Sequence, residues 1–243
     1  MSPAPFTLSE AERRTLRAVA CTLLPAIERD DDPHGFWARD GGSETLIDAL
    51  ELAIDAQSAA QQAEFRRLVA LLDSPLAALT RPGLPLRPFH ALPPPQRARL
   101  LEAWARSGVG PLRRGFQALK RLICFLFYTL TDERGHNPTW PALGYPGRLS
   151  APPTTLARLP TAAPAGRREL WCDTVVVGSG AGGGVVAGEL AEAGHDVIVL
   201  EKGPYVAEEG YTQRELEMIS TLYEARGTLS TADLGITVLA GSA

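Results

Sequence analysis

The sequence predicts an α/β fold in which an all-helical N-terminal region is followed by the start of a Rossmann-like βαβ domain. Two patterns predict it: residues 9–130 carry apolar side chains at helical spacing, and residues 174–201 place a glycine-rich turn between two β-branched runs. With 243 residues and 45% hydrophobic content, the chain can fill a core. We expect a helical domain at 1–130, a Pro/Gly-rich irregular segment and linker at 131–170, and the Rossmann-like domain at 171–243.

The first half of the chain reads as a succession of helices. Ser9 and Glu12 form an S-x-x-E capping box that starts the first helix, and Pro25 stops or kinks it. Residues 30–42 hold three consecutive acids, a proline and three glycines, which predict a solvated loop. Further helices are expected from Ser43, over 61–72, from 96 to about 107 and over 111–130, with an interruption at 75–95.

One apolar run, residues 122–130, has to be considered as a membrane-spanning segment. It has half the length needed to cross a bilayer, which takes about 20 residues, so a buried core helix is the better interpretation. The N-terminus has no basic stretch followed by an apolar one, which disfavours a signal peptide. We expect a cytoplasmic protein; peripheral membrane association is compatible with the sequence but is not indicated by it.

The charge and the cysteine pattern exclude several classes of function. A net charge of -4 without a basic run disfavours nucleic-acid binding. Cys21, Cys124 and Cys172 form neither a CxxC pair nor an even disulfide set, so reduced, buried thiols are expected. The acids at 30–32 lack the spacing of metal ligands, and no metal site is predicted.

Two irregular segments are expected between the domains. Prolines and glycines in Asn137–Gly147 argue against regular structure. Its two aromatic side chains can be buried against the rest of the protein, so we predict a packed irregular loop. Ser150–Arg168 has four prolines and no periodic face, which predicts an extended connector.

The strongest motif is a dinucleotide-binding fingerprint that follows the predicted strand Thr174–Val177. That strand is of the kind buried on both faces of a parallel sheet. Gly178 permits a tight turn, Gly180 lets the backbone approach a pyrophosphate, and Gly183 lets the next helix, about 181–193, pack close to the strand. The N-terminus of that helix would bind the diphosphate through backbone N–H groups. The cofactor-binding candidates are Gly178, Ser179, Gly180, Ala181, Gly182, Gly183, Glu201 and Lys202.

A second predicted strand, residues 196–200, ends at Glu201. A carboxylate there, about 20 residues beyond the glycines, can accept hydrogen bonds from ribose hydroxyls and would repel a 2′-phosphate. The repulsion of a 2′-phosphate argues against NADP as the cofactor. Spacing alone leaves FAD and NAD both open.

The sheet started by these strands needs more strands than the chain supplies, because only 42 of the 243 residues follow Glu201. A helix is expected at 213–223, and residues 236–239 could form a strand that leads into Gly241. We therefore expect an amino-terminal fragment with an incomplete Rossmann-like domain.

Residues 172–184 and Glu201–Gly203 resemble the glucose-methanol-choline (GMC) oxidoreductases. The helical first half, residues 1–130 with Trp104 to Tyr128 among them, and Asn137–Gly147 are similar to the N-terminal region of the long-chain alcohol oxidase branch of that family. Together these segments span most of the chain.

The resemblance implies FAD as the cofactor and oxidation of a small-molecule alcohol, of the long-chain (fatty) class, to an aldehyde by hydride transfer to the flavin. It places the catalytic base, a histidine, beyond residue 243, so no catalytic residue is assigned here. Gly241 and Ser242 are weak site candidates along the flavin, and the electron acceptor cannot be read from the sequence. The four histidines are expected to be ordinary loop or surface residues without a partner acid: His34, His90, His136 and His195.

Two alternatives stay open. The chain could belong to another FAD or NAD oxidoreductase, such as a sterol oxidase or a sugar-acid dehydrogenase. It could also be a helical interaction or maturation module, residues 1–130, fused to a nucleotide-binding domain.

Overall fold

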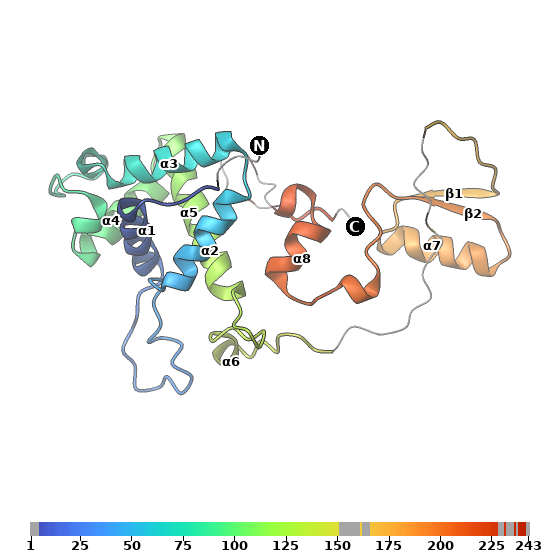
Figure 1. The fold of residues 1–243 in the computed structure, drawn as a ribbon, viewed down its shortest axis with the longest axis horizontal. Helices are drawn as coiled ribbons and strands as arrows, with labels where there is room; N and C mark the ends of the chain where they lie inside the picture. The colour runs from blue at the N-terminus through green and yellow to red at the C-terminus, as the bar shows by residue number, and fades with distance from the viewer. Residues whose placement is uncertain are drawn as a thin grey trace. The chain divides into compact units, whose positions relative to one another are not determined.

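The computed structural model describes residues 5–150, 161, 166–227, 231, 236 and 238–241 (Figure 1). The chain divides into two compact units, Met1–Gly147 with Ser230–Thr237 and Arg148–Leu229 with Val238–Ala243. The first unit is helical and the second contains a βαβ element. The predicted order, a helical region followed by a Rossmann-like βαβ element, is confirmed.

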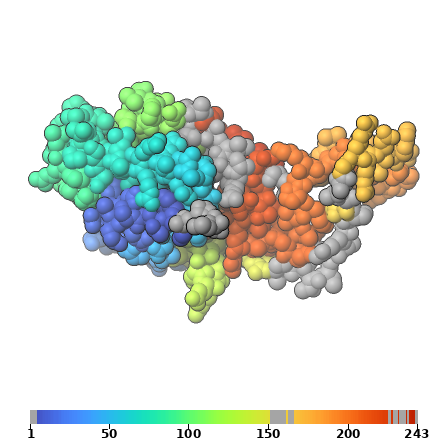
Figure 2. Space-filling view, turned by 45° about the horizontal axis from the view of Figure 1, so that its top comes forward, coloured from blue at the N-terminus to red at the C-terminus, as the bar shows by residue number. Residues whose placement is uncertain are grey.

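Five longer helices build most of the described part of the first unit. They are α1 (Glu10–Leu23), α2 (Glu44–Asp55), α3 (Ala59–Asp73), α4 (Pro94–Ala105) and α5 (Gly110–Thr129), with the 3₁₀ helices η1 (Pro75–Thr80) and η2 (Phe89–Ala91) between α3 and α4. Their apolar faces form one core that includes the fully buried Leu16, Leu50, Trp104 and Ile123. Figure 2 shows these helices, coloured blue to green, in close contact.

Local capping explains where the helices begin. Ser9 and Glu12 form the predicted capping box of α1, and Ser43 caps α2 as predicted. The third helix begins at Ala59, two residues earlier than predicted, because Ser58 and Gln61 form a second capping box. The fourth begins at Pro94 because proline is tolerated in the first turn, where its missing N–H is not needed.

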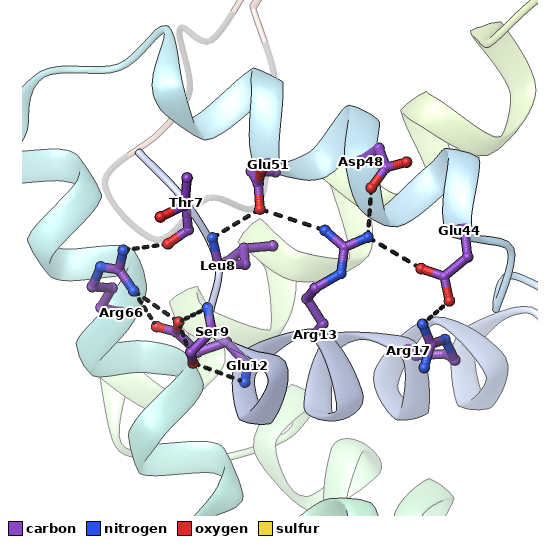
Figure 3. A network of polar contacts seen from close by, with 10 residues as sticks. All are labelled: Thr7, Leu8, Ser9, Glu12, Arg13, Arg17, Glu44, Asp48, Glu51 and Arg66. Atoms are coloured by element: carbon purple, nitrogen blue, oxygen red, sulfur yellow. Dashed lines mark hydrogen bonds and ion pairs between the residues drawn. The ribbon is translucent and has the colours of Figure 1, made fainter. Parts of the chain in front are cut away.

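A network of charged side chains ties α1 to its neighbours (Figure 3). Arg13 of α1 contacts Glu44, Asp48 and Glu51 of α2, at 3.1, 2.5 and 3.4 Å. Arg66 of α3 contacts Glu12 at 2.7 Å and donates to the Thr7 carbonyl at 2.6 Å. The extended residues before α1 are therefore fixed between α2 and α3.

The Trp-Pro segment after α5 is more regular than predicted. Trp140–Leu143 form the single helical turn α6, so the prediction of a wholly irregular loop was wrong at these residues. Pro141 is compatible with it because a proline in the first turn of a helix breaks no hydrogen bond.

Asn137 and Trp140 close the C-terminal end of α5. Asn137 is buried and donates from Nδ2 to the carbonyls of Phe127 and Leu130, at 2.8 and 2.6 Å. Its Oδ1 accepts from the backbone N–H of Thr139 at 2.8 Å, and Trp140 donates from Nε1 to the Tyr128 carbonyl at 2.9 Å. Side chains thus pair carbonyls that the last turn of a helix leaves without intrahelical partners.

The second unit contains the two-stranded parallel sheet of β1 (Thr174–Val177) and β2 (Val197–Leu200), connected by α7 (Ala181–Glu192). Thr174 pairs with Val197 and Val177 with Leu200. The helix contacts both strands. The prediction that β1 is buried on both faces was wrong: Val175 is 52% and Val177 82% exposed, because in the described part of the chain only one helix covers this sheet.

The remaining described residues of this unit form η3 (Glu208–Gly210), α8 (Glu215–Leu222) and η4 (Glu224–Gly227). The helix predicted at 213–223 is confirmed. Tyr223 and Gly241 form an isolated antiparallel bridge, and no strand is assigned to the described residues of 236–239, of which 237 lies outside the description. Of the predicted connector, only residues 150, 161 and 166–168 are described.

Candidate nucleotide-binding site

The candidate site is the turn from β1 to α7. Gly178 ends the strand with φ +94°, a conformation that side-chain-bearing residues rarely adopt, and its N–H donates to the Leu200 carbonyl at 2.8 Å. Two residues later, Gly180 is the N-cap of α7. A tight turn therefore brings the start of the helix to the carboxyl edge of the sheet, which is where ligands bind in open α/β sheets.

Gly183 is the closest contact between the helix and the turn. A Cβ placed there would lie 2.0 Å from the Gly178 carbonyl oxygen and 3.4 Å from Val176 Cγ1. Only glycine permits this approach without a backbone shift. The geometry agrees with the role predicted for the third glycine of the fingerprint.

Gly180 and Gly182 face open space instead. Among the described residues, no atom outside their immediate neighbourhood would lie within 4 Å of a Cβ built on either. The start of α7 carries no acidic residue in its first turn, and Gly180 has no side chain to cap it. The N–H groups of Ala181, Gly182 and Gly183, which a helix leaves without intrahelical acceptors, are thus placed to bind an anion.

Glu201 lies next to this turn. Its Oε2 accepts from the Ser179 N–H at 2.8 Å and from the Ser179 hydroxyl at 2.7 Å, while Oε1 accepts from the Gly203 N–H at 2.8 Å. Hydrogen bonds from the Gly203 and Ser179 N–H groups lower the pKa of Glu201 to about 2. The group is therefore a carboxylate at neutral pH.

The acceptor capacity of Glu201 is not exhausted. An ionised carboxylate offers about four lone-pair positions, two on each oxygen. Both positions of Oε2 are taken by Ser179, whereas the one hydrogen bond of ordinary geometry that Oε1 accepts among the described residues comes from Gly203, with a weaker contribution from the Lys202 N–H to the carboxylate. One acceptor position on Oε1 is available for a ligand hydroxyl.

The opposite ends of the strands are linked by Asp173 and Asp196, which sequence reasoning did not single out. Asp173 donates from its N–H to the Asp196 carbonyl at 3.0 Å, and its carboxylate accepts from the Asp196 N–H at 2.9 Å. These bonds fix the start of the parallel pair, and so help hold the register that brings Glu201 beside Gly178. An acid directly before each strand was the only signal in the sequence.

The structure brings Ser179 and Glu201 together with the glycines but gives Lys202 a different neighbour. Lys202 forms an ion pair with Glu224, and its predicted role in cofactor binding stays a prediction. Gly241 pairs with Tyr223, and Ser242 lies outside the described residues.

The histidines lie apart from the turn in sequence, and one of them differs from the expectation. His90 Nδ1 lies 2.9 Å from Asp73 Oδ1, so the expectation that no histidine has a partner acid was wrong. The pairing joins η2 to the end of α3 over 17 residues, a separation that carries no recognisable motif. Within the described ranges, no three His, Cys, Asp or Glu side chains gather as a metal site.

The described helices give no candidate for a membrane span. None of them is both long and apolar enough to cross a bilayer. The run at 122–130 lies mostly in α5, where Ile123 and Leu126 belong to the core, as the core-helix interpretation predicted.

The donors at this turn fit the adenosine diphosphate part of a dinucleotide. Backbone N–H groups and open space at Gly180 and Gly182 suit a pyrophosphate, and the free acceptor on Glu201 suits a ribose hydroxyl. A 2′-phosphate would place a second anion against a carboxylate that is ionised at neutral pH.

Comparison with known proteins agrees with this geometry. The family model described as "NAD(P)-binding Rossmann-like domain" matches residues 176–242. A long-chain-alcohol oxidase of Arabidopsis thaliana is 31% identical over 205 residues, covering 64% of this chain and 28% of that protein. An uncharacterized GMC-type oxidoreductase of Mycobacterium tuberculosis is 48% identical over 64 residues, which are 26% of this chain and 10% of that protein. The chain is homologous to the GMC-type oxidoreductases.

Its likeness to the long-chain-alcohol oxidase members of this group extends well beyond the nucleotide-binding turn. A second such oxidase of Arabidopsis thaliana is 30% identical over 207 residues, covering 72% of this chain and 27% of that protein. The chain spans about a quarter of the length of these curated relatives. No solved structure gives a significant match.

Proposed function

We propose that this chain binds the adenosine diphosphate half of FAD and serves in the oxidation of long-chain alcohols to aldehydes. The observation that carries the proposal is the assembly of a positive-φ glycine, a close-packed third glycine and an ionised Glu201 at one helix N-terminus. The long-chain-alcohol oxidase names of the relatives support the substrate class.

The residues of this chain bind and orient; none is assigned a chemical step. The N–H groups of Ala181, Gly182 and Gly183 would hold the pyrophosphate, and Glu201 Oε1 would accept a ribose hydroxyl while Ser179 and Gly203 hold the carboxylate in place. FAD, when bound, would supply the acceptor for a hydride from the carbinol carbon.

Binding of the nucleotide is tested by calorimetric titration of the chain with ADP, FAD, NAD and NADP. We expect ADP and FAD to bind, and Glu201→Gln to weaken both by about tenfold to a hundredfold, since a hydrogen bond to a charged group is worth about 1.5–3 kcal/mol. Gly188→Ala, on the same helix with no neighbour within 4 Å of its Cβ, is the matched control and should bind normally. NADP binding as tight as that of ADP would contradict the proposal.

NAD is the second candidate cofactor, because the matching family model is described as NAD(P)-binding. Both dinucleotides contain the same adenosine diphosphate, so Glu201 and the glycines do not separate them. Competition decides: if NAD displaces ADP and FAD does not, the cofactor is a nicotinamide dinucleotide.

The substrate class needs its own assay. Aldehyde formation from a long-chain alcohol should depend on added flavin and should fall when Gly183 is replaced in a protein that carries these residues. Oxidation of polyols or sugar acids, with none of the fatty alcohol, would favour a sugar-acid dehydrogenase instead.

A further inference from the structure

A cationic depression lies in the first unit, on the helical region and apart from the fingerprint in sequence. Its volume is about 280 Å³, and it is lined by Arg14, Arg17, Ala18, Cys21, His90 and Arg97. Three guanidinium groups thus come from two helices, α1 and α4, and line one concave surface together with η2.

The positive charges of this depression are only partly balanced. Arg17 is paired with Glu44 of α2, as Figure 3 shows, and the ring of His90 faces Asp73. Across residues 5–150 and the other described positions, neither Arg14 nor Arg97 has a carboxylate within ion-pair distance. A further acid, Asp40, lies near Cys21: burial of the thiol, and after it the negative charge of Asp40, raises the pKa of Cys21.

Arg97 is held in place without losing its charge. It donates from Nε to the Leu92 carbonyl at 2.7 Å and from Nη2 to the His90 carbonyl at 3.4 Å. Two neutral acceptors therefore orient the guanidinium and leave further N–H donors free for an anion. Little conformational entropy would be lost when a ligand binds to a side chain fixed in this way.

The floor between the arginines is small and apolar. Ala18 is buried, and Cys21 presents its sulfur next to Gly42, where a Cβ would lie 2.5 Å from Sγ. Gly42 therefore leaves room for the thiol at the base of the depression. An anion that entered would have charged groups around it and would cover Cys21 from solvent.

We propose that this depression binds a phosphate group. Guanidinium groups bind phosphate through parallel N–H···O bonds, and a dianion with several acceptor oxygens can satisfy Arg14 and Arg97 at once. A monoanionic carboxylate offers less charge to the same donors. The phosphate could be free, as inorganic phosphate or a soluble ester, or could be the headgroup of a phospholipid.

The test begins with titration of the full chain with inorganic phosphate. Arg14→Gln should weaken phosphate binding about tenfold or more, which corresponds to about 1.4 kcal/mol. Arg14 is exposed and makes no ion pair with a described residue, so its replacement should leave the fold unchanged. Arg99→Gln removes the same charge from an exposed position of α4 that does not line the depression, and it should change affinity less than about twofold.

The position of the bound anion is tested by alkylation of the cysteines with iodoacetamide, mapped by mass spectrometry. Phosphate should slow the modification of Cys21 and leave Cys124 and Cys172 unaffected. Burial raises the pKa of both Cys21 and Cys124, so Cys124 is the matched reference for a slow thiol. Acetate should protect Cys21 far less than phosphate does at the same ionic strength.

Experiments with vesicles distinguish a phospholipid headgroup from a soluble phosphate as the ligand. Protection of Cys21 by phosphatidate vesicles but not by phosphatidylcholine vesicles would indicate a lipid headgroup, whereas protection by phosphate alone would indicate a soluble ligand. Equal effects of Arg14→Gln and Arg99→Gln, or phosphate binding without protection of Cys21, would overturn the proposal.

Discussion

Replacing Gly183 with alanine tests the geometry of the nucleotide site most directly. The new Cβ would stand 2.0 Å from the Gly178 carbonyl oxygen, whereas real Cβ atoms essentially never come within 3.0 Å of such a neighbour. The helix and the turn must therefore separate by about 1 Å, the difference between these two distances. The atom that the new Cβ would meet is a backbone oxygen, so no flexible side chain can relieve the contact.

Two opposing effects decide the sign of the stability change. Alanine in a helix interior is favoured over glycine by about 0.5–1 kcal/mol, while overpacking costs about 1–3 kcal/mol. The steric effect should prevail at Gly183. At Gly188, where a Cβ meets nothing within 4 Å, the helix propensity should prevail and the variant should be as stable as the wild type or more so.

The assays are amide hydrogen exchange of the peptide spanning β1 and the first turn of α7, and calorimetric titration with ADP. Gly183→Ala should exchange faster there and bind ADP at least about tenfold more weakly, because the N–H groups of the helix are displaced from the turn. Exchange and affinity like those of Gly188→Ala would refute the argument that this close contact builds the site.

Three further outcomes are expected. The pKa of Glu201 is about 2 in the folded chain, against an ordinary value of 4.5. Its bonds to Ser179 and Gly203 should therefore contribute fully to the stability of the fold above pH 4.5, and this contribution should be lost as the pH falls through about 2. A carboxyl NMR titration with a midpoint near 4.5 would contradict this. Asn137→Asp should lower the free energy of unfolding by about 3 kcal/mol in a denaturant titration, because it turns a carboxylate oxygen toward the buried carbonyls of Phe127 and Leu130. Leu50→Ala should lower it by about 2–5 kcal/mol, whereas Leu52→Ala on the same helix, 71% exposed, should change it by less than about 0.5 kcal/mol; equal losses would show that the core is placed wrongly.

The sequence predicted the helices well where capping and periodicity agree. The Ser9 box and the apolar positions of α1, α2 and α5 follow from local rules that need no tertiary information. The start of α3 was missed because Ser58 and Gln61 were not read as a box. The turn at Trp140 was missed because proline was treated as a breaker without regard to its position in the helix.

The candidate site, too, was predicted from the sequence only in part. The tight turn at Gly178 and the close packing at Gly183 follow from spacing, since both depend on backbone geometry within a few residues. The approach of Gly180 to a pyrophosphate stays a prediction. The bond between Ser179 and Glu201 joins positions 22 apart and depends on the register of two parallel strands, which composition does not specify. The sequence does not predict the cationic depression at all, because Arg14 and Arg97 are separated by most of the helical unit.

The closure of α5 by Asn137 and Trp140 has a practical consequence for dissecting the protein. A shortened chain that stops at the last residue of that helix would lose the amide paired with Phe127 and Leu130 and the indole that bonds to Tyr128. It would also lose the contact between Trp140 and Gly147, where a Cβ would lie 2.7 Å from the ring. Truncation for crystallisation or binding studies should therefore keep residues through 147, and limited proteolysis should spare this stretch.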